Sequence, residues 1–311
     1  MNFGYNRPLY LLPFDHRHSF VTGLFNFDPP LTLDQHEAIA DGKRVIYDGF
    51  RQALGKDVPT ASAAILVDEE FGADILRDAV KSGYLTALST EKSGSNEFEF
   101  EYGSAFAEHI EAFGPTFAKV LVRYNPGGDA ALNRRQTARL KQLSDYCRSA
   151  NQLFMFELLV PATKAQMDRA QADKHTYDLQ IRPELMLQAI RTLQDGGVEP
   201  DVWKIEGLDR REDCERVVVV VRRDGRDDVG CIVLGRGADE ERVAAWLETA
   251  ASVPGFIGFA VGRTTFWEAV ADYEANNASR QEAVSRVAHR YGQWAAIFER
   301  HHVTSHQSTS R

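Results

Sequence analysis

The chain has 311 residues, enough for two ordinary domains or for one large domain such as an α/β barrel. It carries 36 basic and 45 acidic residues, and the formal net charge of −9 argues against general binding to nucleic acid or to anionic membranes. Its three cysteines, Cys147, Cys214 and Cys231, form no CxxC pair, so we expect reduced thiols in a cytoplasmic protein rather than disulfides or a zinc site. The longest purely aliphatic run, 217–221, is far too short to span a bilayer, and no signal peptide is evident.

Short apolar runs that end in polar or charged residues recur along the chain, and helix-like stretches follow them. Eight runs are predicted strands: Leu9–Phe14, Ala63–Val67, Leu85–Thr90, Ala118–Val122, Leu153–Phe156, Val202–Ile205, Cys231–Leu234 and Phe256–Val261. Predicted helices include one that begins after a capping box at Thr32 and Gln35, followed by Leu132–Cys147, Arg182–Leu193, Glu240–Ala251 and a closing helix over Glu282–Arg300.

This alternation of strands and helices predicts a parallel sheet, and eight strands are the number that closes a (β/α)8 barrel. A doubly wound sheet is the alternative, but no GxGxxG turn follows the first predicted strand. We therefore predict one barrel domain over residues 1–300 and a polar, disordered tail over 301–311. Because the catalytic residues of such barrels lie at the carboxyl ends of the strands, the charged residues found there indicate an enzyme.

Lys204 lies inside the sixth predicted strand, where alternation places it on one face with Val202 and Glu206. Trp203 and Ile205 occupy the other face, which suits packing against the outer helices, so we expect the amine to point into the barrel beside a carboxylate. An inward lysine near other cations has a lowered pKa, as an imine-forming nucleophile requires. The alternative is a structural ion pair between Lys204 and Glu206.

Glu157 ends the fifth predicted strand between Phe156 and Leu158, in apolar surroundings that would raise the pKa of a carboxyl group. A carboxyl group whose pKa lies near neutrality can pass protons in both directions, which suits a general acid–base catalyst. In the alternative interpretation, Glu157 is an ion-pair partner of Arg123 or Lys119.

Three polar loops are candidates for binding an anionic substrate. The loops after the seventh and eighth strands, where barrels commonly bind phosphate, contain Gly235, Arg236, Gly237, Gly262 and Arg263. Glycines let backbone N–H groups approach an oxyanion, and a guanidinium pairs with it through two hydrogen bonds. The loop after the fourth strand contains Arg123, Arg134 and Arg135, which either hold a substrate carboxylate or lie on a solvated helix surface.

Acidic residues near the first three strand ends would suit a divalent metal: Asp15, Asp68, Glu69, Glu70 and Glu91. Cationic residues alternate with them at neighbouring strand ends and favour an internal charge network instead: Arg17, Lys92, Lys119 and Lys204. The histidines His16, His18 and His109 lack metal-binding spacing, so we predict no metal and no cofactor. His16 and Arg17 are candidates either for substrate contact or for ordinary hydrogen bonds.

Taken together, the strand ends resemble a bacterial class I aldolase-like family. The matching segments are LPFDHR (12–17), VDEEFG (67–72), EKSG (91–94), KVLVRYNP (119–126), FELLVP (156–161), EPDVWKIEG (199–207), VLGRG (233–237) and GFAVGRT (258–264). This family is best known as the C-terminal domain of bifunctional 5-dehydro-2-deoxygluconokinases in inositol catabolism. It is more distantly similar to tagatose-1,6-bisphosphate aldolase, and the resemblance runs through all eight predicted strands.

The resemblance implies a (β/α)8 barrel that cleaves a ketose phosphate through a lysine imine, without a metal. It places the imine-forming lysine at Lys204, the proton-shuttling glutamate at Glu157 and the phosphate-binding arginine at Arg263, beside the loop 235–237. Three further residues match positions that line that site: Asp15, Glu91 and Lys119.

The implied substrate is a small phosphorylated keto-sugar acid, 6-phospho-5-dehydro-2-deoxy-D-gluconate, cleaved to dihydroxyacetone phosphate and malonate semialdehyde. Arg134 or Arg135 would then meet its carboxylate. Two departures concern the substrate: the family is most often fused behind a sugar kinase whereas this chain starts at the aldolase-like part, and His18 stands where glycine is expected. The alternatives are a metal-dependent barrel lyase or isomerase and a non-catalytic sugar-phosphate sensor; a homo-oligomer is left open.

Overall fold

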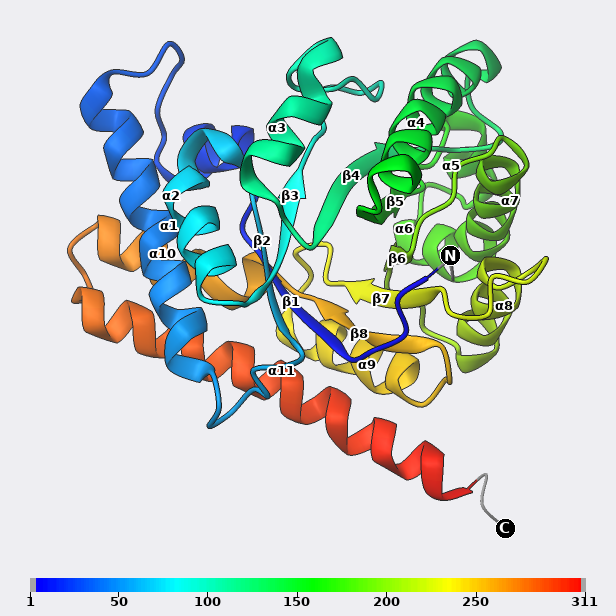
Figure 1. The fold of residues 1–311 in the computed structure, drawn as a ribbon. Coiled ribbons are helices and arrows are strands. Elements are labelled where there is room, and N and C mark those ends of the chain that lie inside the picture. Colours follow the sequence, from blue (N-terminus) through cyan, green and yellow to red (C-terminus); the bar gives the residue numbers. More distant parts are fainter. Residues whose placement is uncertain (1–3, 309–311) are drawn as a thin grey trace.

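The structure is a computed structural model that describes residues 4–308, and it forms a closed barrel of eight parallel strands with helices outside (Figure 1). The strands follow one another around the barrel in chain order, and β8 pairs with β1 to close it. Their bounds are β1 (Leu9–Pro13), β2 (Ala63–Val67), β3 (Leu85–Ser89), β4 (Phe117–Arg123), β5 (Leu153–Leu159), β6 (Val202–Glu206), β7 (Gly230–Leu234) and β8 (Phe256–Ala260). The predicted (β/α)8 fold is confirmed, and each strand overlaps the run from which it was predicted.

Helical segments connect the strands and cover the outside of the barrel. The α-helices are α1 (Leu33–Ala53), α2 (Glu69–Lys81), α3 (Phe106–Phe113), α4 (Ala130–Ala150), α5 (Lys164–Arg169), α6 (Lys174–Thr176), α7 (Arg182–Asp195), α8 (Arg211–Val221), α9 (Glu240–Ala251), α10 (Arg263–Glu274) and α11 (Arg280–Ser308). Two π-helical turns, η1 (Phe20–Leu24) and η3 (Tyr177–Ile181), and a 3-10 turn, η2 (Gly103–Ala105), complete the set. Within residues 4–308, no helix combines the length and apolar character needed to cross a membrane.

The helix ends show which local signals the sequence carries. Helix α1 begins with the predicted capping box, in which Thr32 Oγ1 accepts from Gln35 N–H and Gln35 Oε1 accepts from Thr32 N–H. Helix α11 continues to Ser308, beyond the end predicted at Arg300, so the predicted tail is helical as far as Ser308. Residues 309–311 lie outside the described residues.

The interior of the barrel changes from apolar to charged along the strands. Phe117 on β4 and Val202 on β6 belong to a buried apolar cluster that fills the amino-terminal part of the barrel. Because side chains alternate along a strand, Lys119 and Lys204 lie on the same face two residues further on, and Glu157 on β5 lies between them. The fold therefore sets a layer of charge on an apolar floor, at the end of the barrel where such folds place their active sites.

The outer faces of the strands form a second and larger apolar cluster with the helices. Trp203 and Ile205 belong to it, as the alternation in β6 predicts. The strands thus pack one face against the helices, while the inner faces of β4, β5 and β6 also carry the charged layer.

Candidate active site

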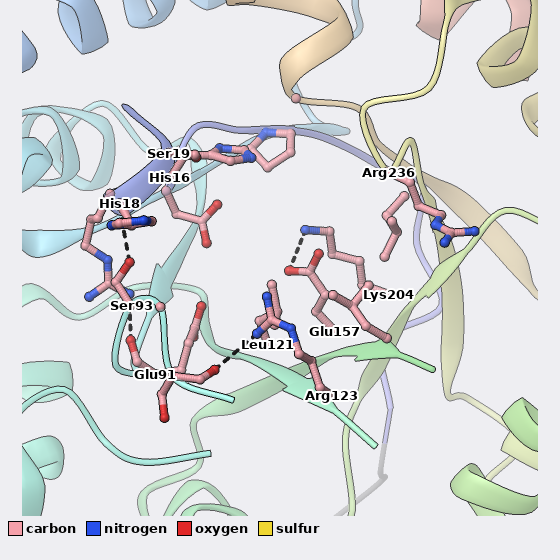
Figure 2. Close-up of a pocket in the computed structure, with 18 of the residues that line it drawn as sticks. His16, His18, Ser19, Glu91, Ser93, Leu121, Arg123, Glu157, Lys204 and Arg236 are labelled. Atoms are coloured by element: carbon pink, nitrogen blue, oxygen red, sulfur yellow. Dashed lines mark hydrogen bonds and ion pairs between the residues drawn. The ribbon is translucent and has the colours of Figure 1, made fainter. Parts of the chain in front are cut away.

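A cavity of about 470 Å³ opens at the carboxyl ends of the strands (Figure 2). Most of the residues predicted for the site line it: Asp15, Arg17, Glu91, Arg123, Glu157, Lys204, Glu206, Gly235, Arg236, Gly237, Gly262 and Arg263. Lys119 lies behind three of these side chains and contacts their carboxyl groups. Arg134 and Arg135 are not among the residues that line the cavity.

Lys204 and Glu157 form the pair at the centre of the cavity. The register of β5 and β6 places Glu157 directly opposite Lys204, and Lys204 Nζ lies 2.8 Å from Glu157 Oε2 (Figure 2). Both side chains are buried. The amine does point into the barrel beside a carboxylate, but the carboxylate belongs to the neighbouring strand, so the predicted pairing of Lys204 with Glu206 is wrong.

Glu206 instead belongs to a network that fixes the loop after β7. Its Oε1 lies 2.9 Å from Arg236 Nε, and its Oε2 accepts a 2.8 Å hydrogen bond from Val160 N–H. Arg236 also pairs with Asp178 at 2.9 Å, and Asp178 in turn accepts from Arg182 Nε at 2.9 Å. Sequence reasoning missed Asp178 and Arg182, although their spacing of four residues is that of a helical ion pair. Arg236 is therefore held by two carboxylates at the cavity wall.

Lys119 is fully buried and is surrounded by carboxyl groups from three other strands or strand ends. Its Nζ lies 2.7 Å from Asp15 Oδ2, 2.7 Å from Glu91 Oε1 and 3.0 Å from Glu157 Oε2. The alternative interpretation of Glu157 as an ion-pair partner of Lys119 is thus observed, together with its contact to Lys204. One carboxylate joins the two amines of the site.

The carboxyl groups around Lys119 do not all have the same protonation state. Burial alone would raise the pKa of Glu157, but the ammonium groups of Lys119 and Lys204 outweigh it and hold the pKa below its usual value. The same balance lowers the pKa of Asp15. The rise predicted for Glu157 from its apolar neighbours is therefore wrong, and at neutral pH this residue is a carboxylate.

Glu91 behaves in the opposite way. Burial raises its pKa, and the nearby Asp15 carboxylate adds to the rise, against the lowering effects of Lys119 and Arg17. One carboxyl oxygen faces Lys119, while Oε2 is buried without a hydrogen-bond partner among the described residues. Such an oxygen is better tolerated on a neutral carboxylic acid than on a carboxylate.

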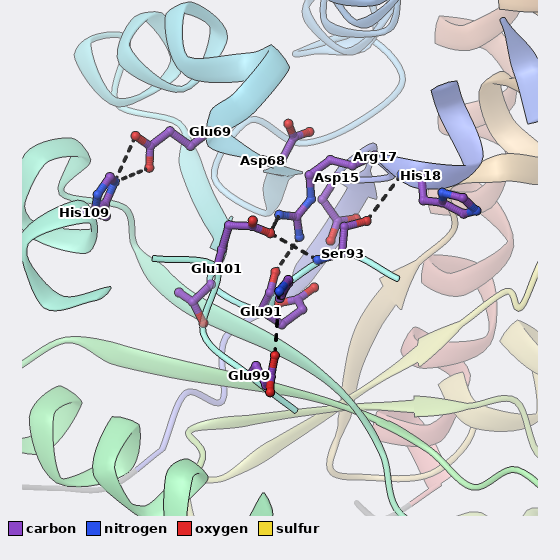
Figure 3. Close-up of polar contacts among 12 residues, drawn as sticks. Asp15, Arg17, His18, Asp68, Glu69, Glu91, Ser93, Glu99, Glu101 and His109 are labelled. Atoms are coloured by element: carbon purple, nitrogen blue, oxygen red, sulfur yellow. Dashed lines mark hydrogen bonds and ion pairs between the residues drawn. The ribbon is translucent and has the colours of Figure 1, made fainter. Parts of the chain in front are cut away.

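Arg17 ties the loop between β3 and α3 to the end of β1 (Figure 3). Its Nη1 lies 2.5 Å from Glu101 Oε2, and its Nη2 donates a 2.6 Å hydrogen bond to the backbone carbonyl of Glu91. The same Glu101 oxygen accepts from Ser93 N–H at 3.1 Å. The guanidinium of Arg17 is thus engaged in holding the backbone that carries Glu91.

Beyond the predicted Glu91, this loop supplies a wall of the cavity, since residues 92–98 line it as well. Arg135 and Arg139 on α4 pair with Glu97 of the loop, at 2.7 and 2.6 Å. Arg134 is exposed on the same helix. The predicted arginine pair therefore lies outside the cavity, and Arg135 helps to hold the loop.

Two arginines that line the cavity have no carboxylate partner among residues 4–308. Arg123, at the end of β4, donates a 3.2 Å hydrogen bond to the backbone carbonyl of Ser95. Arg263, at the start of α10, donates a 2.8 Å hydrogen bond to the backbone carbonyl of Arg236. In a closed eight-stranded barrel, β4 and β8 lie opposite each other. The cavity thus has a charge-bearing guanidinium on each of two opposing sides.

The acids near the end of β2 have structural partners. Asp68 caps α2 by accepting from Phe71 N–H at 2.9 Å, and it pairs with the buried Lys43. Glu69 Oε2 lies 2.8 Å from His109 Nδ1 (Figure 3). In the described part of the chain, no group of three or more His, Cys, Asp or Glu side chains has the arrangement of a metal site.

The chain matches, over residues 5–302, a bacterial protein family described as "Uncharacterized protein conserved in bacteria (DUF2090)". It belongs to this family. No curated protein matches the DUF2090 chain in sequence.

Two of the solved structures with a similar fold are fructose-bisphosphate aldolases, and a third has no activity in its description. The fructose-bisphosphate aldolase of Plasmodium falciparum has a TM-score of 0.62 at 14% identity, covering 96% of this chain and 97% of that one. A Schiff base-forming fructose-1,6-bisphosphate aldolase has a TM-score of 0.57 at 13% identity, with 94% of each chain covered. Cgl0159 of Corynebacterium glutamicum has a TM-score of 0.56 at 15% identity, covering 94% of this chain and 88% of that one. These likenesses confirm the fold of the DUF2090 chain.

The three carboxyl groups around Lys119 generate a stability prediction. Lys119→Met should lower the free energy of unfolding by about 3–5 kcal/mol, because buried carboxyl groups lose their shared counter-charge. The matched control is Lys141→Met, which removes an exposed ion pair with Asp145 and should cost under about 1 kcal/mol. Chemical unfolding of both variants measures the difference, and equal small losses would contradict the structural role given to Lys119.

Proposed function

We propose that this protein is a class I aldolase, a carbon–carbon lyase that cleaves a ketose phosphate through an imine on Lys204. The observation that carries the proposal is the 2.8 Å contact between Lys204 Nζ and Glu157 Oε2 inside a cavity with an unpaired arginine on each side. An amine becomes a nucleophile only after it loses its proton, and Glu157 is the acceptor in contact with it.

The first half of the reaction forms the imine. The proton moves from the Lys204 ammonium to Glu157, and the free amine attacks the substrate ketone to give a carbinolamine. Glu157 then returns the proton to the carbinolamine hydroxyl, which leaves as water, so that a protonated imine remains. The ammonium group of Lys119 stabilises the Glu157 carboxylate, so Glu157 readily gives up each proton that it has accepted.

The second half breaks the carbon–carbon bond. The Glu157 carboxylate accepts the proton of the hydroxyl group on the far side of that bond, and the bonding electrons move into the imine to give an enamine and an aldehyde. Glu157 next protonates the enamine carbon, and water hydrolyses the protonated imine to release dihydroxyacetone phosphate and regenerate the Lys204 ammonium group. We assign all of these proton transfers to one carboxyl group because it contacts Lys204 Nζ, the atom to which the reacting substrate becomes bonded.

The two unpaired arginines indicate the shape of the substrate. Arg263, beside the glycines of the loops after β7 and β8, suits the phosphate, and Arg123 on the opposite side suits a second anionic group. 6-Phospho-5-dehydro-2-deoxy-D-gluconate has a phosphate at one end, a carboxylate at the other and a ketone between them. We therefore assign the carboxylate to Arg123 instead of Arg134 or Arg135.

The imine mechanism predicts that Lys204→Met has no turnover, because methionine keeps the volume of the side chain but has no nucleophile. Release of dihydroxyacetone phosphate from the keto-sugar acid, coupled to a dehydrogenase, is the measurement. Unchanged thermal unfolding is the control for an intact fold. Turnover retained in this variant would exclude Lys204 as the imine former.

Glu157→Gln should slow turnover by roughly two to four orders of magnitude, the usual range for loss of a general acid–base. The amide keeps the shape and can still donate to the substrate, but it cannot take the proton of Lys204. Steady-state rates from pH 6 to pH 9 measure the effect. A loss below tenfold would assign the proton transfers to another group.

The carboxylate assignment predicts that Arg123→Ala raises KM for the keto-sugar acid by roughly 10- to 100-fold, since one charge-assisted contact is lost. Its matched control is Arg134→Ala, an arginine outside the cavity, which should change KM less than twofold. If Arg134→Ala had the larger effect, the carboxylate would lie on the α4 side instead.

A further inference from the structure

His16 occupies a place in the cavity that the proposed mechanism does not use. It follows the end of β1 and lines the cavity together with Gly262 and Arg263. Its ring lies between Phe20 and Phe266, with ring centroids 6.4 and 5.8 Å away. The aromatic contacts fix where the imidazole can point.

The imidazole edge that carries both nitrogens borders the start of α10. His16 Cε1, the carbon between the two ring nitrogens, lies 3.3 Å from where a Cβ on Gly262 would stand. Gly262 is the N-cap of α10, a 12-residue helix that begins at Arg263. The first N–H groups of a helix favour an anion, and Arg263 adds a guanidinium at the same point.

His16 Nδ1 is buried and has no hydrogen-bond partner among the described residues. Neither ring nitrogen of His16 makes a hydrogen bond to the described residues although the residue lines the cavity, so a ligand in the cavity can supply the missing partner. No carboxylate or carbonyl of the described residues takes this role.

Four charged groups from four elements face His16: Asp15 beside it after β1, Arg263 on α10, Lys204 on β6 and Lys43 on α1. Burial lowers the pKa of His16, Asp15 opposes this, and the three cations lower it further, to about 4. At neutral pH the ring is therefore uncharged while the cavity holds no anion.

We propose that His16 is a proton-coupled ligand for the phosphate group: a dianionic oxyanion binds at the start of α10 between Arg263 and His16, and His16 takes up one proton from solvent as it enters. The proposal rests on the proposed function only for the identity of the natural anion, a phosphate ester. No covalent bond changes; the imidazole gains a proton and donates it in a hydrogen bond to the oxyanion.

The charges around the His16 ring explain why anion binding and proton uptake are coupled. Arg263 and Lys204 disfavour a protonated His16 in the empty cavity, and a dianion placed among them reverses the local field. The positive charge of the protonated His16 then offsets part of the negative charge of the bound dianion. The affinity for the anion should consequently rise as the pH falls, because the complex binds a proton and protons are more abundant at low pH.

Sulfate is the probe, since it remains a dianion across the range used and any proton taken up must go to the protein. Calorimetric titration at pH 6, in two buffers with different heats of ionisation, gives the number of protons bound with each sulfate. The wild-type protein should take up about half a proton or more, and its affinity should rise at least about fourfold from pH 7.5 to pH 5.5. His16→Gln should still bind sulfate through Arg263 but should lose the uptake and most of the pH dependence.

His18→Gln is the matched control, because His18 is the exposed histidine of the same loop. It should keep the proton uptake of the wild-type protein. No uptake in the wild-type protein, an equal uptake in His16→Gln, or loss of uptake in His18→Gln would each overturn the proposal. Sulfate carries no ketone, so these outcomes do not depend on whether Lys204 forms an imine, and Lys204→Met turnover does not depend on them.

Discussion

The buried ammonium group of Lys119 determines how the polar end of this barrel is built. A charge in that position requires counter-charges, which Asp15 after β1 and Glu157 on β5 supply, and the carboxyl group of Glu91 after β3 adds a third contact. These contacts hold three strand ends at one point and keep Glu157 ionised. Glu157 also contacts Lys204. Lys119 therefore both joins the strand ends and keeps ionised the carboxylate that accepts the proton of the proposed nucleophile.

The arginines around the cavity divide into two kinds, and the division is informative about function. Arg17 and Arg236 are paired with carboxylates, and each holds a loop that forms part of the wall. Arg123 and Arg263 contact only backbone carbonyls and lie on opposite sides. An elongated substrate with an anionic group at each end fits this division better than one with a single charged end.

The sequence was sufficient to predict the strands, because each combines an apolar run with a charged end, and the capping box at Thr32 marked the start of α1. It also placed Lys204 inside the barrel, since alternation along one strand is a local property. Contacts between side chains on different strands could not be predicted in the same way. The partner of Lys204 depends on the register of β5 and β6, and a single strand carries no record of that register.

The error over the pKa of Glu157 has the same origin. Phe156 and Leu158 are its neighbours in sequence, but both side chains belong to the outer apolar cluster, on the other face of the strand. The groups that set its charge are Lys119 and Lys204, from the adjacent strands. Likewise, the wall formed by 91–98 depends on the distant contact of Arg17 with Glu101, which no local pattern reveals.

Borohydride trapping shows whether Lys204 forms an imine with a ketose phosphate. The protein is incubated with dihydroxyacetone phosphate, reduced, and examined first by intact mass and then by peptide mapping. We expect one reduced adduct, on the peptide that contains Lys204. An adduct on Lys92 or Lys119 would contradict the assignment of the nucleophile, and no adduct despite tight binding by calorimetry would contradict the imine mechanism itself.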